Sequence, residues 1–351
     1  MPRWALARKT YRQLQIARLN AHRGYVVSSP CRLGARRDKE VEVLESRRVR
    51  DRSFGRVLIL CASVAAAAVL LRPAASAYAE PTPSLHSDDD TLKGRSGKLR
   101  AVLVPRSGRR IGVLERLFGD SLLRTPGVHA VRDSGGAMDV ALITMRDFGD
   151  KLGGRIGGYR IGFWPAEKGR RTPTAAYANP EGFIEVTPEN ADTPISEHFR
   201  LSDFLTHDQQ GVWPKYLVLR APLVDKLELV ISQLEARGTQ VHHMQVMSGF
   251  RTPLYNARAG ERGGRSKISR HMYGDAADVF VDNDGDGRMD DLNHDGRIDY
   301  RDAQVILDAV EQVERQHDDL VGGVGVYRAT RSHGPFAHVD VRGNRARWGR
   351  L

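Results

Sequence analysis

Ser-Arg-His-Met-Tyr-Gly-Asp-Ala-Ala-Asp, residues 269–278, is the stretch that decides the fold and the chemistry of this chain. Gly274 permits a turn that brings His271 back beside Asp278, and the apolar residues around Asp278 predict an extended strand. His338 lies far downstream on the apolar run Phe-Ala-His-Val-Asp-Val. Two imidazoles and one carboxylate are the usual protein ligands of a catalytic zinc ion, which keeps a further position for water. The pattern therefore indicates a zinc site.

Basic residues are concentrated at the N-terminal end. The net charge is +11, but residues 1–80 hold 16 Lys and Arg against 6 Asp and Glu. The rest of the chain is nearly neutral, so a nucleic-acid partner is not expected. Both cysteines, Cys31 and Cys61, lie in the same leader. A metal in the remainder must therefore take His and carboxylate ligands, because thiolates are missing there.

The leader also contains an apolar run, residues 57–71. It is shorter than the about 20 residues that a membrane-spanning helix needs. Ala-Tyr-Ala at 77–79 follows, a small-residue pattern typical of signal-peptidase sites. We expect an export signal cleaved after Ala79 and hence a periplasmic or extracellular protein. The long basic segment before the run leaves an alternative, in which residues 57–71 stay as an N-terminal membrane anchor.

Composition divides the chain into four segments. Residues 1–79 form the leader, and residues 80–98, rich in Pro, Ser, Asp and Gly, are predicted to be a linker. Residues 99–195 are predicted to form a small β-rich accessory domain, with strands at 101–104, 140–143, 159–164 and 183–186 and a short helix at 113–118. Residues 196–351 are predicted to form the domain with the zinc site, with strands at 241–247 and 276–281, a helix between Pro222 and Gly238 and another at 303–316.

Three motifs of the last domain together resemble one protein family. They are Ser-Gly-Phe-Arg-Thr-Pro at 248–253, the stretch at 269–278 and Phe-Ala-His-Val-Asp-Val at 336–341. With Asn256, they are similar to the hallmarks of the M15 zinc peptidases, which include D-Ala-D-Ala carboxypeptidases and murein endopeptidases, over about residues 215–350. The resemblance implies an α+β fold of the hedgehog/D-Ala-D-Ala peptidase-like type, a small antiparallel sheet with packed helices. It also implies that His271, Asp278 and His338 are the zinc ligands.

Two further roles follow from the same motifs. The planar guanidinium of Arg251 suits a substrate carboxylate or carbonyl, with a structural ion pair as the alternative. Some relatives place a Glu, Asp or His just before the last ligand, or use a His-x-His pattern. Here Pro-Phe-Ala at 335–337 cannot move a proton. Asp340 points to the same side as His338 if the segment is extended. We expect Asp340 in the active site, as base, as orienting group or as a replacement ligand, and His333 as the weaker candidate base.

An acidic insertion, residues 282–302, separates the second and third motifs. Counted from Asp291, oxygen-bearing side chains fall at positions 1, 3, 5, 9 and 12, with glycine at 6, which is the EF-hand calcium-loop pattern with Asp in place of the final Glu. A second register begins at Asp282 and overlaps the first. We therefore predict a compact double calcium loop, with a solvated acidic loop as the alternative. The expected calcium ligands are Asp282, Asp284, Asp286, Asp290, Asp291, Asn293, Asp295, Asp299 and Asp302.

The expected function combines these elements. The resemblance implies a zinc-dependent peptidase that hydrolyses cross-links or stem peptides of peptidoglycan, with zinc and calcium as cofactors. A zinc-containing cell-wall-binding module without catalysis is the first alternative, because an acid upstream of the last ligand is missing. A processing peptidase for other peptides is the second.

Overall fold

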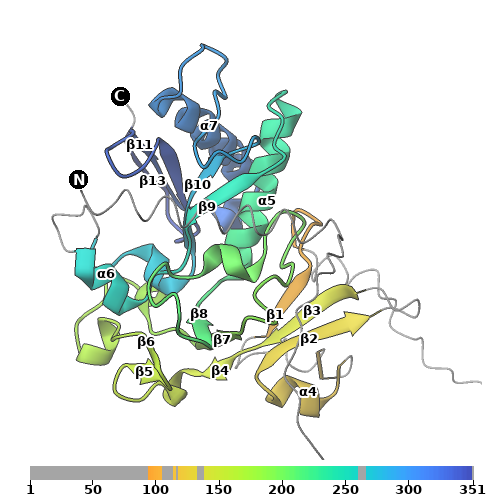
Figure 1. The fold of residues 1–351 in the computed structure, drawn as a ribbon, viewed down its shortest axis with the longest axis vertical. Coiled ribbons are helices and arrows are strands. Elements are labelled where there is room, and N and C mark those ends of the chain that lie inside the picture. The colour runs from red at the N-terminus through yellow and green to blue at the C-terminus, as the bar shows by residue number, and fades with distance from the viewer. Residues whose placement is uncertain (1–93, 105–113, 116–117, 133–137, 260–265, 350–351) are drawn as a thin grey trace, which may run out of the picture. The chain divides into compact units, whose positions relative to one another are not determined.

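The structure, a computed structural model, describes residues 94–104, 114–115, 118–132, 138–259 and 266–349 (Figure 1). All of them belong to one unit, Ala79–Leu351. The predicted leader, its apolar run at 57–71, the export signal and most of the linker lie outside the described residues. In the described part, no helix has both the length and the apolar character that crossing a membrane requires.

A five-stranded sheet carries the second and third motifs. Its strands are β9 (Met244–Ser248), β10 (Ala276–Val281), β11 (Gly323–Tyr327), β12 (Phe336–Asp340) and β13 (Ala346–Trp348), in the order β13-β11-β12-β10-β9. β10 is buried along its whole length, which explains its run of apolar and small residues. The neighbouring strands are antiparallel except β13, which runs parallel to β11 at the edge. That parallel edge departs from the predicted antiparallel sheet, because the chain passes beyond β11 after β12 ends.

Two helices support this sheet. α5 (Ala221–Ala236) packs against α7 (Tyr300–Gln316), and α7 also contacts β11 and β12 (Figure 1). Both helices were predicted from apolar residues at helical spacing, and those residues are buried, except Val305, which is partly buried. α7 begins before the predicted residue 303, because Asp299 and Asp302 form a capping box around its first turn.

The preceding residues form three smaller sheets. β1 (Ala101–Val104), β3 (Met138–Thr144) and β2 (Gly127–Arg132) make one sheet, β4 (Arg146–Asp147), β7 (Gly182–Val186) and β8 (Lys215–Leu217) make the second, and β5 (Arg155–Ile156) pairs with β6 (Tyr159–Arg160). Short helices α4 (Asp120–Arg124) and α6 (Pro253–Ala259) complete the named elements. The strand predicted at 159–164 stops at Arg160, because Ile161 and Gly162 donate their N–H groups to the carbonyl of Gly154.

The architecture agrees with an α+β class, with small sheets and few helices. The hedgehog-type fold stays a prediction, and so do the domain boundaries. The predicted boundary at residue 195 falls between β7 and β8, which pair with each other. Residues on both sides of it, such as Phe183 and Leu217, belong to one hydrophobic core. The helical residues 114–115 and 118 lie within the short helix that was predicted there.

Candidate metal centre

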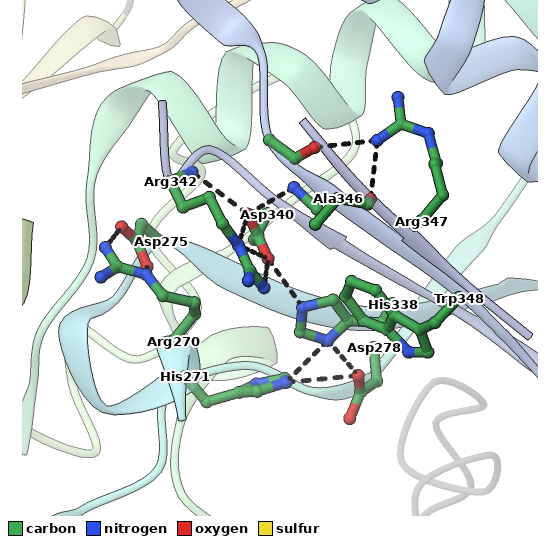
Figure 2. A network of polar contacts seen from close by, with 12 residues as sticks. Arg270, His271, Asp275, Asp278, His338, Asp340, Arg342, Ala346, Arg347 and Trp348 are labelled. Carbon is green, nitrogen blue, oxygen red and sulfur yellow. Dashed lines mark hydrogen bonds and ion pairs between the residues drawn. The ribbon is translucent and has the colours of Figure 1, made fainter. Parts of the chain in front are cut away.

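Three elements bring the two histidines and the aspartate of the motifs together. His271 lies on a short 3₁₀ turn, Arg270–Tyr273, just before β10. Asp278 lies on β10 and His338 directly opposite it on β12. All three side chains are buried, and each offers one ligand atom to a common point. Figure 2 shows the group, with the side chains of His271 and Asp278 converging on one edge of the His338 ring.

The spacing of the three ligand atoms suits a metal ion. His271 Nε2 is 3.2 Å from His338 Nδ1 and 3.2 Å from Asp278 Oδ1, and His338 Nδ1 is 2.9 Å from Asp278 Oδ1. A tetrahedral zinc ion with bonds of about 2.0–2.2 Å holds neighbouring ligand atoms about 3.3 Å apart. A zinc ion thus fits the group with only small shifts of the side chains.

The second nitrogen of His271 fixes the tautomer of its ring. Nδ1 lies 2.7 Å from the carbonyl oxygen of Gly249, to which it can only donate a hydrogen. Nε2 therefore keeps its lone pair, and it faces Asp278 and His338. Burial lowers the pKa of His271 to about 4. The ring is neutral at physiological pH, as a metal ligand must be.

A carboxylate orients the other histidine. His338 Nε2 lies 3.1 Å from Asp340 Oδ2, on the side of the ring away from Asp278 (Figure 2). Burial lowers the pKa of His338, but hydrogen bonds to Asp278 and Asp340 outweigh burial and raise it. A proton on His338 Nδ1 accounts for its contact with Asp278. A metal ion at the centre takes the place of that proton, since imidazole binds metals in the neutral form.

Asp340 is held by several donors besides His338. The Nε of Arg342 lies 2.9 Å from both carboxylate oxygens, and the backbone N–H of Gly323 donates to Oδ1 at 2.7 Å. Burial raises the pKa of Asp340, but the bonds from His338 and Arg342 lower it below its ordinary value. Asp340 thus stays ionised. Its contact with His338 agrees with the predicted orienting role, and its roles as base or replacement ligand stay predictions.

Arg251 pairs with Asp278. Its guanidinium forms an ion pair with Asp278 Oδ2, and its Nε donates to Ser248 Oγ at 2.8 Å. The pair uses the carboxylate oxygen that does not face the histidines. Burial raises the pKa of Asp278, but its contacts with His271 and His338 and the positive charge of Arg251 bring it well below its ordinary value. The ion pair weighed as the alternative is present, and the substrate-binding role of Arg251 stays a prediction.

A glycine and an ion pair hold the turn that presents His271. Gly274 has φ of 69°, and a Cβ there would lie 2.3 Å from the carbonyl oxygen of Val218. Only glycine fits both constraints, as the sequence indicated. Arg270 and Asp275 form a buried ion pair across the same turn, with Nε and Oδ1 3.0 Å apart (Figure 2).

Aromatic residues that the sequence did not single out line the same centre. The indole of Trp348 lies 5.2 Å from the His338 ring, measured between ring centroids, and its Nε1 donates to the Tyr327 hydroxyl at 2.9 Å. Gly325 lies opposite both His338 and Trp348, and a Cβ there would lie 2.0 Å from Trp348 Nε1. The Gly-Val-Gly-Val spacing of β11 was the one available signal, since a glycine inside a strand marks a close approach.

The other predicted proton carrier, His333, packs beside this group. Its ring meets the Phe336 ring edge-on at 5.0 Å, and its Nδ1 lies 2.8 Å from the Gly334 carbonyl. Phe336 precedes His338 by two residues in β12, so both side chains leave the strand on the same face. His333 therefore stays a candidate base. Asn256, the remaining motif residue, donates to the carbonyl of Ser266 at 2.9 Å.

The structure separates the predicted calcium ligands into three groups. Asp282, Asp284 and Asp290 bring carboxylate oxygens within 4.8 Å of one another. Asp291, Asn293 and Asp295 form a second turn, in which their side chains accept backbone N–H groups. Asp299 and Asp302 cap α7, while Asp286 accepts the N–H of Arg288 at 2.8 Å. Calcium ligation by these residues stays a prediction.

Comparisons with known proteins add little to the geometry. No family model matches the chain, and no curated protein matches it. Among solved structures, it is similar to the crystal structure of the Serratia marcescens L-Ala D-Glu endopeptidase ChiX, with 21% identity, 35% of this chain and 82% of that chain covered, and a TM-score of 0.24. So low a TM-score supports no functional argument. Fold and site define an α+β protein whose buried His-Asp-His group can bind a metal ion.

Proposed function

We propose that the chain is a zinc-dependent peptidase that hydrolyses peptide bonds of peptidoglycan, in cross-links or in stem peptides. One observation carries the metal dependence: His271, Asp278 and His338 are buried together, with the second nitrogens of both rings held by Gly249 and Asp340. Such outer contacts orient metal-bound histidines. Two nitrogens and one oxygen at these spacings favour zinc.

The substrate class rests on the three sequence motifs. They resemble peptidases that act on D-amino-acid peptides of the cell wall, and the residues they carry meet at one point of the structure. A wall substrate also accords with the predicted export of the chain. Peptidoglycan is therefore the proposed partner, and the periplasm or the cell exterior the proposed location.

The chemistry divides between the metal and the chain. A bound zinc ion supplies Lewis-acid polarisation of a peptide carbonyl and lowers the pKa of a water. His271 and His338 supply neutral imidazole nitrogens, and Asp278 supplies a negative charge balanced by Arg251. Asp340 keeps the His338 ring in one orientation. His333 is the proposed proton carrier, because the contacts of Asp340 with His338 and Arg342 already use that carboxylate.

A non-catalytic wall-binding module is the second candidate, and one observation favours it. Asp340 was the carboxylate nearest in sequence to the last ligand, and its oxygens contact His338, Arg342 and the Gly323 N–H. If Asp340 only orients His338, then His333 is the remaining candidate for the general base among the two that the sequence indicated. If His333 moves no proton either, the centre keeps its metal without hydrolysing a peptide.

Digestion of purified sacculi separates these functions. The full-length protein with zinc is expected to release muropeptides, detected by mass spectrometry, and His271→Ala is expected to release none, because a ligand is lost. His242→Ala, which changes an exposed histidine away from the centre, should retain the parent rate. His333→Gln should lower the rate without lowering the zinc content.

Three outcomes would contradict the proposal in different ways. A folded, zinc-loaded parent that is retained on sacculi without releasing product supports the binding module. A parent that ignores sacculi but cleaves other peptides supports the processing peptidase. Equal release by the parent and by His271→Ala would show that the proposed centre is not the catalytic site.

A further inference from the structure

Just beyond β10 lies a buried carboxylate oxygen that has no partner in the part of the chain that the structure describes. Asp282 is 3% exposed, and its Oδ2 accepts the backbone N–H of Gly287 at 3.0 Å. Its Oδ1 is buried and has no hydrogen-bond partner among the described residues. Leaving a carboxylate oxygen buried without a donor or a cation is strongly unfavourable, so the position of this oxygen points to a missing positive charge.

Two further carboxylates lie close to that of Asp282. Asp284 and Asp290 each bring an oxygen within 4.8 Å of Asp282 and of each other. Backbone groups fix both: Asp284 Oδ1 accepts the N–H of Asp286 at 3.1 Å, and Asp290 Oδ2 accepts that of Asn283 at 3.0 Å. The loop therefore gathers like charges at one point, against their mutual repulsion.

We propose that Asp282, Asp284 and Asp290 bind one calcium ion. Calcium prefers 6–8 oxygen ligands from carboxylates and backbone carbonyls in flexible geometry, whereas magnesium demands a regular octahedron and keeps several waters. In the loop register that begins at Asp282, Asp286 and the carbonyl of Arg288 occupy positions 5 and 7, where EF-hand loops supply further oxygens. The cation neutralises the group and satisfies the buried oxygen.

The second register differs in the state of its acidic side chains. Both oxygens of Asp291 accept backbone N–H groups, from Asp295 at 3.2 Å and Gly296 at 2.8 Å. Both oxygens of Asp302 do the same, with Oδ1 accepting from Leu292 at 2.9 Å and Oδ2 from Asp299 at 2.7 Å. These carboxylates already stabilise the turn and the start of α7. The inference is therefore one calcium ion, at the first register, where the sequence predicted a double site.

The position of the site gives the ion a structural role. The loop joins β10 to α7, and its apolar residues Met289 and Leu292 are buried in the main core. An ion that holds Asp282 and Asp290 together fixes the end of β10, the strand that also carries Asp278. The calcium site does not depend on the proposed peptidase activity, because binding and thermal stability report it directly.

Isothermal titration of the full-length protein with calcium chloride tests the proposal. We expect one equivalent to bind, with a Kd of about 10⁻⁴–10⁻³ M, as in extracellular calcium modules. Magnesium chloride should bind at least about tenfold more weakly. Calcium at ten times its Kd should raise the melting temperature by about 3–6 °C.

Two matched variants locate the site. Asp284→Asn and Asp295→Asn make the same change at exposed positions of the two registers, so both are expected to fold. Asp284→Asn should weaken calcium binding by at least about tenfold, since it removes one ligand charge. Asp295→Asn should bind within about twofold of the parent. A folded parent that takes up no calcium, a parent that prefers magnesium, uptake of two equivalents, or loss of binding in Asp295→Asn alone would each overturn the proposal.

Discussion

Asp278 and Asp282 are four residues apart in sequence, yet their carboxylates are in opposite states. Asp278 Oδ1 contacts both histidines, and its Oδ2 pairs with Arg251. Asp282 has one oxygen bonded to a backbone N–H, and the other is buried without a partner among the described residues. At the proposed zinc end of β10, which carries Asp278, both carboxylate oxygens thus have partners. At the proposed calcium end, which leads to Asp282, one oxygen has none among the described residues.

The two ends also differ in how the chain assembles them. His338 and Asp278 are 60 residues apart in sequence, and His338 and His271 are 67 apart. In the loop, by contrast, Asp282 and Gly287 are 5 residues apart, and Asp284 and Asp286 are 2 apart. Tertiary packing therefore positions the proposed zinc ligands, while local turns position the proposed calcium ligands. A change that disturbs tertiary packing should remove the first site, whereas a change within the loop at 282–290 should remove only the second.

Gly274→Ala should produce the largest effect. Alanine would adopt a φ of 69° that strains it, and its Cβ would lie 2.3 Å from the backbone oxygen of Val218, which cannot easily move. We expect the free energy of unfolding to fall by about 3 kcal/mol or more, in line with strain combined with overpacking. The displaced turn also carries His271, so zinc binding should be lost with it. Chemical denaturation and zinc content of the purified protein measure the two effects.

Gly97→Ala is the control for that change. Gly97 has a similar φ of 70°, but a Cβ there meets nothing within 4 Å. Only the backbone strain remains, which costs about 1 kcal/mol. Similar losses in the two variants would show that the contact with Val218 does not constrain the turn.

Sequence motifs indicate the members of the proposed zinc centre better than their surroundings. His271, Asp278 and His338 follow from motifs, because each ligand lies in a distinctive local pattern. The sequence does not indicate the contact with the carbonyl of Gly249, because any residue type offers a backbone oxygen. It does not indicate the position of the Trp348 indole either, because strand register depends on tertiary pairing. The order of the five strands and the parallel pairing of β13 could not be predicted either, because they too depend on tertiary pairing.

The acidic loop shows the opposite limitation. Its sequence spacing predicted nine oxygen ligands without distinguishing which oxygens are already used. Asp302 matches position 12 of a calcium loop and equally the third position of a capping box. Its Oδ2 accepts the N–H of Asp299 at the start of α7, and its Oδ1 accepts the N–H of Leu292 in the loop. Asp299 three residues earlier was the available signal for the cap. Spacing alone cannot choose between the two uses, because both need an acid at the same place.

Asp340→Asn should produce an intermediate effect confined to the zinc end. The change keeps the shape of the side chain but removes the charge that orients His338. Loss of such outer partners lowers metal affinity by about 10–100-fold, or about 1.4–2.7 kcal/mol. Competition with a chromogenic chelator measures the zinc affinity, and calcium titration should give the parent value.

Arg342→Gln sharpens that result. It removes the ion pair with Asp340 but leaves the contact between Asp340 and His338. Its zinc affinity should fall less than that of Asp340→Asn. An unchanged zinc affinity in Asp340→Asn would contradict the assignment of Asp340 as a positioning residue and reopen its role as a base.

The smallest expected effect concerns Trp348 and Tyr327, the aromatic residues beside the proposed zinc ligands. Trp348 Nε1 donates to the Tyr327 hydroxyl at the protein surface, and a surface hydrogen bond contributes about 0.5–1 kcal/mol. Trp348→Phe, Tyr327→Phe and the double variant form a cycle in which the loss of indole volume cancels, so the coupling energy isolates the bond. Chemical denaturation of the parent and the three variants should give a coupling energy of that size. The zinc affinity of each variant should stay within about threefold of the parent value. The reason is that Trp348 packs beside His338 without contributing to its hydrogen bonds with Asp278 and Asp340. A coupling energy near zero would mean that the hydrogen bond between Trp348 and Tyr327 does not contribute to stability. A large fall in zinc affinity would mean that Trp348 and Tyr327 position the metal ligands as strongly as Asp340 does.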